Sequence, residues 1–254
     1  MDRCDRGTRA SKLPAPAGTG EKGNDRIRLP VMLDLKAYGG LVFLLLVMAA
    51  LLFALAGTLD YWQAWAFLAV YFAASLAITI YLMKMDRKLL ERRMSGGPTA
   101  EKEPAQKIIM LFASLGFVGL LVVPALDHRF AWSHMQASVA LIGNMLVLLG
   151  WLAIFIVFRE NTFTSATIEL APDQKVISTG PYALVRHPMY AGAIVMFLGI
   201  PIALGSWWGV LILVAMMPVL IWRLFDEEKF LARNLDGYVE YQKRVRHRLI
   251  PLVW

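Results

Sequence analysis

This sequence is poor in cysteine and lacks the usual nucleotide-binding loop motifs. Its 254 residues include a single cysteine, Cys4, so disulfide bonds play no part in the fold. No Gly-x-Gly-x-x-Gly sequence follows a predicted strand, and no Walker-type lysine loop occurs. A soluble Rossmann-type cofactor domain is therefore not expected. Nothing near His128 and His134 completes a ligand set, so no metal site is expected either.

Charge is also absent from long stretches of the sequence. Hydrophobic residues make up 58% of the chain, against roughly 45–50% in soluble domains, and the mean hydropathy is +0.54. A transmembrane helix needs about 20 apolar residues, which identifies the uncharged runs as membrane-spanning candidates. These runs are Ala37–Leu59, Tyr61–Met83, Ile108–Leu126, Met135–Phe158 and Met189–Trp222.

The last run, Met189–Trp222, differs from the other four. It is too long for one crossing and short for two full crossings with a loop. Glycines and Pro201 interrupt its middle, and a Trp pair follows Gly205. We predict a hairpin of two short helices that turns near Gly205–Trp208; the alternative is one long helix kinked at Pro201. The expected fold is all-α, an integral membrane protein with about six transmembrane segments.

The basic residues lie at alternate ends of the apolar runs. Eight Lys and Arg residues occur up to Lys36, seven in Lys84–Lys107 and seven from Arg223 onward. The positive-inside rule places these parts in the cytoplasm, with both termini inside. We expect a multi-pass protein of a bacterial inner membrane that contacts membrane lipids and binds no nucleic acid; the sequence does not predict an oligomeric state.

Three parts follow along the chain. Residues 1–34 are predicted to be a disordered basic tail, because they are rich in Gly, Pro, Arg and Lys and poor in large apolar side chains. Residues 35–134 are predicted to form the N-terminal transmembrane helices. Residues 135–254 are predicted to form a core that contains a long polar connection and the hairpin.

The polar block Gly180–Gly192 runs straight into the last apolar segment. Lipid penalises polar groups, so a His, an Arg and two Tyr at a membrane edge indicate a functional role. Pro188 suits the first turn of a helix, and the free N–H groups there favour an anion. His187 is equally consistent with a proton carrier, an anion-binding donor or a helix-capping residue.

A second polar cluster follows the last apolar run. Arg223 and Glu227 are four residues apart and share one face of a continuing helix, whereas Glu228 is rotated by about 100°. One interpretation is a surface salt bridge between Arg223 and Glu227. The other is that Glu227 faces a cationic ligand and Arg223 an anionic one.

Together these motifs resemble the isoprenylcysteine carboxyl methyltransferase family and the related phospholipid N-methyltransferases. The resemblance runs from about Asn161 to the C-terminus. It is carried by an ordered set: Thr179-Gly180-Pro181-Tyr182, Arg186-His187-Pro188-x-Tyr190-x-Gly192, an apolar hairpin, Arg223 with Glu227-Glu228, Gly237-Tyr238-x-x-Tyr241, and Arg248-Leu249-Ile250-Pro251.

The resemblance implies S-adenosylmethionine as the methyl donor, bound in a pocket at the cytoplasmic membrane edge. It implies carboxyl O-methylation of an isoprenylcysteine-like, lipophilic or lipidated acceptor. Glu227 would hold the cationic part of the cofactor, and Arg223 would face the acceptor carboxylate. The other implied cofactor-binding residues are Gln174, Lys175, Val176, Ile177, Tyr182, His187, Pro188, Met189 and Tyr190. The eukaryotic enzymes tend to have His-Thr where this chain has Gln174-Lys175.

Other functions stay open at this point. Phospholipid N-methylation is one, and an amine acceptor would need a base such as His187 or Glu227. Membrane sterol or enone reductases that use NADPH also carry an Arg-His-Pro-x-Tyr block, although they commonly have Asn in place of Met189. A transporter or membrane scaffold is the third alternative, and the absence of charge within the runs argues against a transporter.

Overall fold

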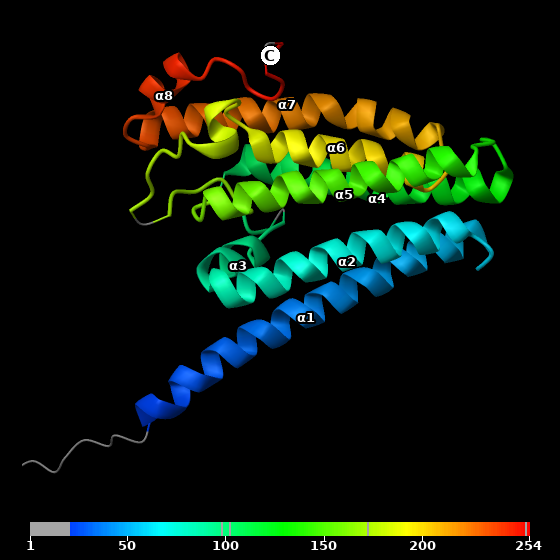
Figure 1. Cartoon of the computed structure of the whole chain (residues 1–254), viewed down its shortest axis with the longest axis horizontal. Helices are drawn as coiled ribbons and strands as arrows, with labels where there is room; N and C mark the ends of the chain where they lie inside the picture. Colours follow the sequence, from blue (N-terminus) through cyan, green and yellow to red (C-terminus); the bar gives the residue numbers. More distant parts are fainter. Residues whose placement is uncertain (1–20, 98, 102, 172, 252) are drawn as a thin grey trace, which may run out of the picture.

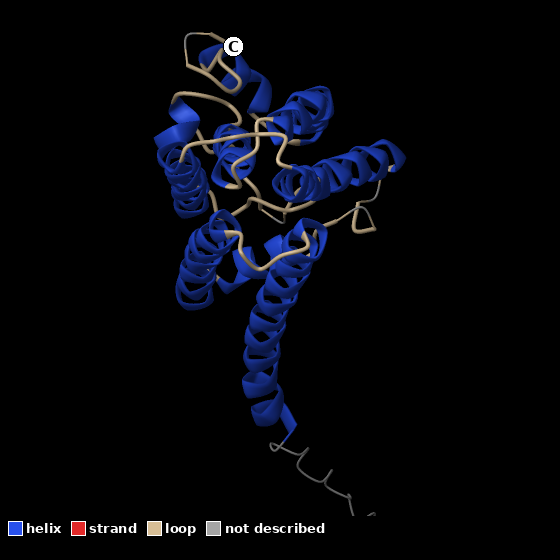
Figure 2. Ribbon diagram, turned by 90° about the vertical axis from the view of Figure 1, so that its right-hand side faces the viewer, coloured by secondary structure: helices blue, strands red, loops and turns tan. Residues whose placement is uncertain are grey.

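The computed structural model describes residues 21–97, 99–101, 103–171, 173–251 and 253–254. Within these ranges all regular secondary structure is helical. Figure 2 shows helices joined by loops. The helices are α1 (Glu21–Ala56), α2 (Trp62–Met85), α3 (Arg87–Met94), α4 (Pro104–Phe130), α5 (Ala137–Glu160), the 3₁₀ helix η1 (Gly180–Ala183), α6 (Pro188–Ala203), α7 (Trp208–Asn234) and α8 (Tyr238–Arg244).

Five of these helices are long and apolar enough to cross a membrane. They are α2, α4, α5, α7 and the Met32–Ala56 part of α1, while α6 is a shorter apolar helix. Figure 1 shows the long helices lying side by side, with α1 and α2 on one side and α6 and α7 on the other. The prediction of an all-helical integral membrane protein is confirmed.

The last apolar run forms a hairpin. Helix α6 ends at Ala203 and α7 begins at Trp208, and Gly205 occupies the left-handed region with φ 79°, which glycine adopts without strain. The predicted turn is therefore confirmed, and the single kinked helix is wrong. Of the two predicted short helices only α6 is short. Helix α7 has 27 residues, because it continues through Arg223 and Glu227, as their predicted helical face requires, to Asn234.

Helix α1 begins at Glu21, within the segment predicted to be a disordered tail. The structure therefore gives a helix in the second part of that segment, and residues 1–20 lie outside the described ranges. Helix α1 runs without a turn from this polar part into the first apolar run.

A buried carboxylate fastens the hairpin turn to α4. Asp127, in the last turn of α4, is only 1% exposed. It accepts hydrogen bonds from the Ser133 amide (2.6 Å), the Ser133 hydroxyl (2.7 Å) and the Ser206 hydroxyl. The Tyr61 hydroxyl donates to the Leu204 carbonyl at 2.6 Å. Asp127 follows directly after the uncharged run Ile108–Leu126; its burial is possible because these donors compensate its desolvation.

Close backbone contact joins α5 to α6. A Cβ atom added to Gly143 would lie 2.1 Å from the Ala203 nitrogen, and one added to Gly150 would lie 2.7 Å from the Gly192 carbonyl oxygen. Membrane helices lack a hydrophobic drive to associate, so small residues that allow close van der Waals packing stabilise their contacts. This contact sets the position of α6, which begins at the residues of the Arg-His-Pro motif.

We expect Gly143→Ala to destabilise the protein, because the new methyl group would force α5 and α6 apart. Overpacking of this kind costs about 1–3 kcal/mol, and the melting temperature in detergent should fall. Gly40→Ala is the matched control, since nothing lies within 4 Å of a Cβ atom at Gly40 of α1. Equal melting temperatures of the two variants would contradict this account of the packing.

Candidate active site

A cavity of about 390 Å³ lies where the polar segments meet. Figure 1 shows α3, α8 and the loop between α5 and α6 gathered at the same end of the long helices. The volume falls within the roughly 300–1,000 Å³ typical of small-molecule sites. This end of the molecule carries the basic segments around Arg92 and Lys243.

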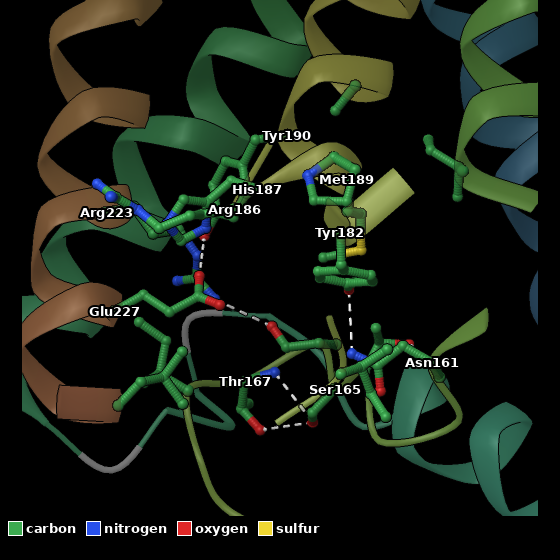
Figure 3. A pocket seen from close by; sticks show the side chains of 18 of the residues that line it. Asn161, Ser165, Thr167, Tyr182, Arg186, His187, Met189, Tyr190, Arg223 and Glu227 are labelled. Carbon is green, nitrogen blue, oxygen red and sulfur yellow. Dashed lines mark hydrogen bonds between the residues drawn. The ribbon is translucent and has the colours of Figure 1, made fainter. Parts of the chain in front are cut away.

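All eleven site residues named from the sequence line this cavity. They are Gln174, Lys175, Val176, Ile177, Tyr182, His187, Pro188, Met189, Tyr190, Arg223 and Glu227. Figure 3 shows Arg223 and Glu227 reaching in from one side, with Tyr182 and Met189 on the other. The structure thus brings the residues together, and their roles toward a cofactor stay predictions.

Helix α6 begins as the sequence predicted, with Pro188 at its first turn and His187 at the N-cap. The His187 side chain makes no capping hydrogen bond, so the structure does not support a capping role. The first-turn amides of an α-helix have no intrahelical acceptor. Met189 and Tyr190 line the cavity and belong to this first turn, so their amides are without an intrahelical acceptor.

Glu228 holds the start of α6 against α7. Its carboxylate lies 2.7 Å from Arg186 Nε, 3.2 Å from His187 Nε2 and 3.1 Å from Arg248 Nε. An ionised carboxylate can only accept hydrogen bonds, so Nε2 of His187 carries the proton in this contact. In the neutral imidazole, Nδ1 is then the acceptor. His187 itself is only 4% exposed.

Arg186 and Arg248 fasten the C-terminal segment to the same place. The Arg186 and His187 amides donate to the carbonyls of His247 and Arg248, each at 2.9 Å. The Arg248 guanidinium lies over the rings of Phe225 and Trp254, at 5.1 and 5.6 Å from their centroids. The C-terminal segment around Arg248 thus supports the start of α6, and two motifs that are far apart in the sequence are in contact in the structure.

Glu227 faces the cavity separately from Glu228. The Tyr190 hydroxyl donates to Glu227 Oε2 at 2.6 Å, and Glu227 lines the cavity. The rotation expected between adjacent helical positions therefore separates two roles: Glu228 binds protein cations, and Glu227 leaves one carboxylate oxygen for another donor. A carboxylate in this position favours a cation in the cavity.

Arg223 pairs with a residue that the sequence did not identify. Its Nη2 donates to Glu101 Oε1 at 2.9 Å and to the Ala166 carbonyl at 3.1 Å, and its Nη1 donates to Gln106 Oε1 at 3.0 Å. The alternative of a salt bridge between Arg223 and Glu227 is therefore wrong. Because Glu101 is buried, most of the Arg223 charge is already compensated within the protein.

The N-terminal part of the chain completes the site. Arg93 of α3 and Met110 and Ala113 of α4 line the cavity, and Glu101 and Gln106 hold Arg223. These residues lie outside the segment 135–254 that the sequence predicted as the core. No spacing rule links positions more than 100 residues apart, so the sequence offered no signal for these contacts.

Two tyrosines, Tyr182 and Tyr241, line the loop side of the cavity and form hydrogen bonds there. The Asn161 amide donates to the Tyr182 hydroxyl at 3.0 Å, and the Tyr241 hydroxyl donates to the Tyr182 carbonyl at 2.8 Å. Burial raises the pKa of Tyr241 to about 12 and holds the pKa of Tyr182 well above its ordinary value. Both phenols therefore stay protonated at neutral pH.

The part of the cavity that lies deeper among the helices is apolar. Its walls come from the middle of α4, α5, α6 and α7, and include Ala113, Trp151, Met196, Phe197 and Met216. The polar walls come from the loop between α5 and α6 and from the helix ends. The cavity therefore offers a polar region and an adjoining apolar region to its ligands.

We expect Glu228→Gln to destabilise the protein, because it leaves Arg186 buried without a counter-charge. Removing one member of a buried ion pair costs about 3 kcal/mol, so the melting temperature should fall clearly. Glu227→Gln is the matched control: it replaces the neighbouring carboxylate, whose hydrogen-bond donor is a neutral phenol, and should cost much less. Equal melting of both variants would contradict the central role of Glu228.

Comparison with known proteins agrees with the sequence resemblance. Residues 138–236 match the model of the family described as phospholipid methyltransferase. A search of the curated proteins finds no match. The matched segment contains α5, α6, α7 and the loop that carries most of the cavity residues. This segment, which is less than half of the chain, is similar to the phospholipid methyltransferases, a family of membrane methyltransferases.

Proposed function

We propose that this protein transfers a methyl group from S-adenosylmethionine to a lipophilic acceptor at the cytoplasmic face of the membrane. The observation that carries the proposal is the convergence of all eleven predicted site residues on one cavity. Most of this cavity belongs to the segment that matches the methyltransferase family. The match favours methyl transfer over NADPH-dependent reduction and over a non-catalytic role.

The polar part of the cavity fits the donor's groups. The cofactor supplies a methyl group on a sulfonium, next to an amino acid and a nucleoside. Glu227 can hold the ammonium through the oxygen that Tyr190 leaves free. Tyr182 and the first-turn amides of α6 supply donors for polar groups of the ligand. Residues 164–169 and 174–177 of the loop line this region, and a site shielded from water by such a loop favours an aligned displacement.

The apolar part of the cavity supports a lipophilic acceptor. A carboxylate acceptor is already a nucleophile, so carboxyl O-methylation of an isoprenylcysteine-like molecule needs no base. The pairing of Arg223 with Glu101 leaves that guanidinium less able to bind an acceptor carboxylate than the sequence resemblance implies. Arg223 is therefore better suited to holding Ala166 and the adjoining loop in place.

Phospholipid N-methylation is the second candidate, and the family match favours it. An amine acceptor must lose a proton before or during transfer. His187 has the arrangement this step needs, because Glu228 fixes the protonated Nε2 and leaves Nδ1 as the acceptor. The mass and alkali stability of the product distinguish the two acceptor classes.

We expect the purified protein to bind S-adenosylhomocysteine, and Glu227→Gln to weaken that binding about tenfold or more, because a charge-assisted hydrogen bond is lost. Isothermal titration calorimetry in detergent checks both values. Glu240→Gln is the control, since Glu240 is exposed on α8 and does not line the cavity. Unchanged affinity in Glu227→Gln would rule out this placement of the ammonium.

We expect membranes that contain the protein to transfer label from methyl-tritiated S-adenosylmethionine to a lipid-soluble product. Alkali releases the label as methanol from a methyl ester, whereas an N-methyl product keeps it. Membranes that contain His187→Ala should lose most of the labelling if the acceptor is an amine, because the base is gone. Retained N-methylation in that variant would contradict the assignment of His187 as the base.

A further inference from the structure

Arg93 is a cavity residue that forms no ion pair with the described residues. Its Nη1 donates to the Ser165 carbonyl at 2.7 Å, and its guanidinium carbon lies 5.3 Å from the centroid of the Phe158 ring. In the described part of the chain, no carboxylate comes within ion-pair distance of it. Neither the hydrogen bond to Ser165 nor the contact with the Phe158 ring gives Arg93 a negatively charged partner.

The other two arginines that line the cavity are neutralised. Arg186 lies 2.7 Å from Glu228, and Arg223 lies 2.9 Å from Glu101. The charges of Arg186 and Arg223 are therefore already paired with carboxylates of the protein. Arg93 differs from them, because a guanidinium has five N–H donors and, among the described residues, Arg93 uses one of them in a hydrogen bond, to the Ser165 carbonyl.

Arg93 is half-buried, so its guanidinium is partly removed from water without a counter-charge, and a ligand anion would relieve that cost. Burial lowers the pKa of Arg93, and this effect outweighs the opposing influence of Glu227 nearby. Arg93 and Glu227 line the same cavity without forming an ion pair. Arg93 and Glu227 are thus a positive and a negative group that can both act on a ligand between them, whereas Lys175, which also lines the cavity, is exposed.

We propose that Arg93 binds the oxyanion of a zwitterionic ligand whose ammonium group lies toward Glu227. Two molecules offer this chemistry: the amino-acid part of the cofactor, with its carboxylate, and an aminophospholipid headgroup, with its phosphate. The inference rests on the proposed function for the role of Glu227. It goes beyond the family match, because Arg93 lies outside residues 138–236.

The test compares Arg93→Met with Arg92→Met. Arg92 also holds the loop, through the Thr162 carbonyl, but does not line the cavity. Each variant is titrated with S-adenosylhomocysteine, with methylthioadenosine, which lacks the amino-acid part, and with glycerophosphoethanolamine. If the cofactor is the source of the oxyanion, Arg93→Met weakens binding of S-adenosylhomocysteine about tenfold or more and changes methylthioadenosine binding less than twofold.

If the lipid is the source, Arg93→Met loses glycerophosphoethanolamine binding and keeps that of S-adenosylhomocysteine. Arg93→Lys should restore part of the lost affinity in either case, because it restores the charge without the guanidinium geometry. The proposal is overturned if Arg93→Met and Arg92→Met change all three affinities alike. Failure of the native protein to bind S-adenosylhomocysteine would sink the proposed function, while the headgroup titration would still decide the role of Arg93.

Discussion

One buried carboxylate, Glu228, holds together the parts of the chain from which the cavity is built. It binds Arg186 and His187 at the start of α6, and Arg248 in the C-terminal segment. A buried carboxylate is tolerated only with such partners. Since Glu227 follows on the same helix, the contact also fixes where the second carboxylate enters the cavity. Two adjacent residues are thus divided between lining the cavity and supporting its walls.

The opposite end of the α6–α7 hairpin is fixed by a second buried carboxylate. Asp127 binds Ser206 in the turn and Ser133 after α4. Between these two polar ends, α5 and α6 are in close backbone contact at Gly143 and Gly150. Polar contacts at both ends and close packing in the middle are what a membrane allows, because association of apolar surfaces alone gains little there. The cavity therefore has rigid walls on the α5, α6 and α7 side.

Much of the fold could be predicted because lipid imposes a simple requirement on sequence. The uncharged runs coincide with the long helices, and Gly205 with the turn of the hairpin. The second helix of the hairpin was predicted as a short membrane span, with Arg223 and Glu227 on a continuation of it; α7 follows that continuation and ends at Asn234. Charged residues extend a helix beyond the membrane as readily as they end a span.

The site was predictable in its C-terminal part and not in its N-terminal part. Local motifs named the eleven residues that share the cavity. Arg93, Glu101 and Gln106 were missed, because their contacts with the loop and with Arg223 depend on how α3 and α4 pack, which no local spacing records. Glu228 was noted from the sequence, but its partners could be found only in three dimensions.

The central claim is that one cavity, lined by Glu227, His187 and Tyr182, holds the methyl donor. Ultraviolet crosslinking of radiolabelled S-adenosylmethionine to the purified protein, followed by peptide mapping, tests it most directly. The account predicts label in peptides from 174–190 or 223–241, removed by excess S-adenosylhomocysteine. Competed label at the other end of the helices, around Asp127 and Ser206, would contradict it.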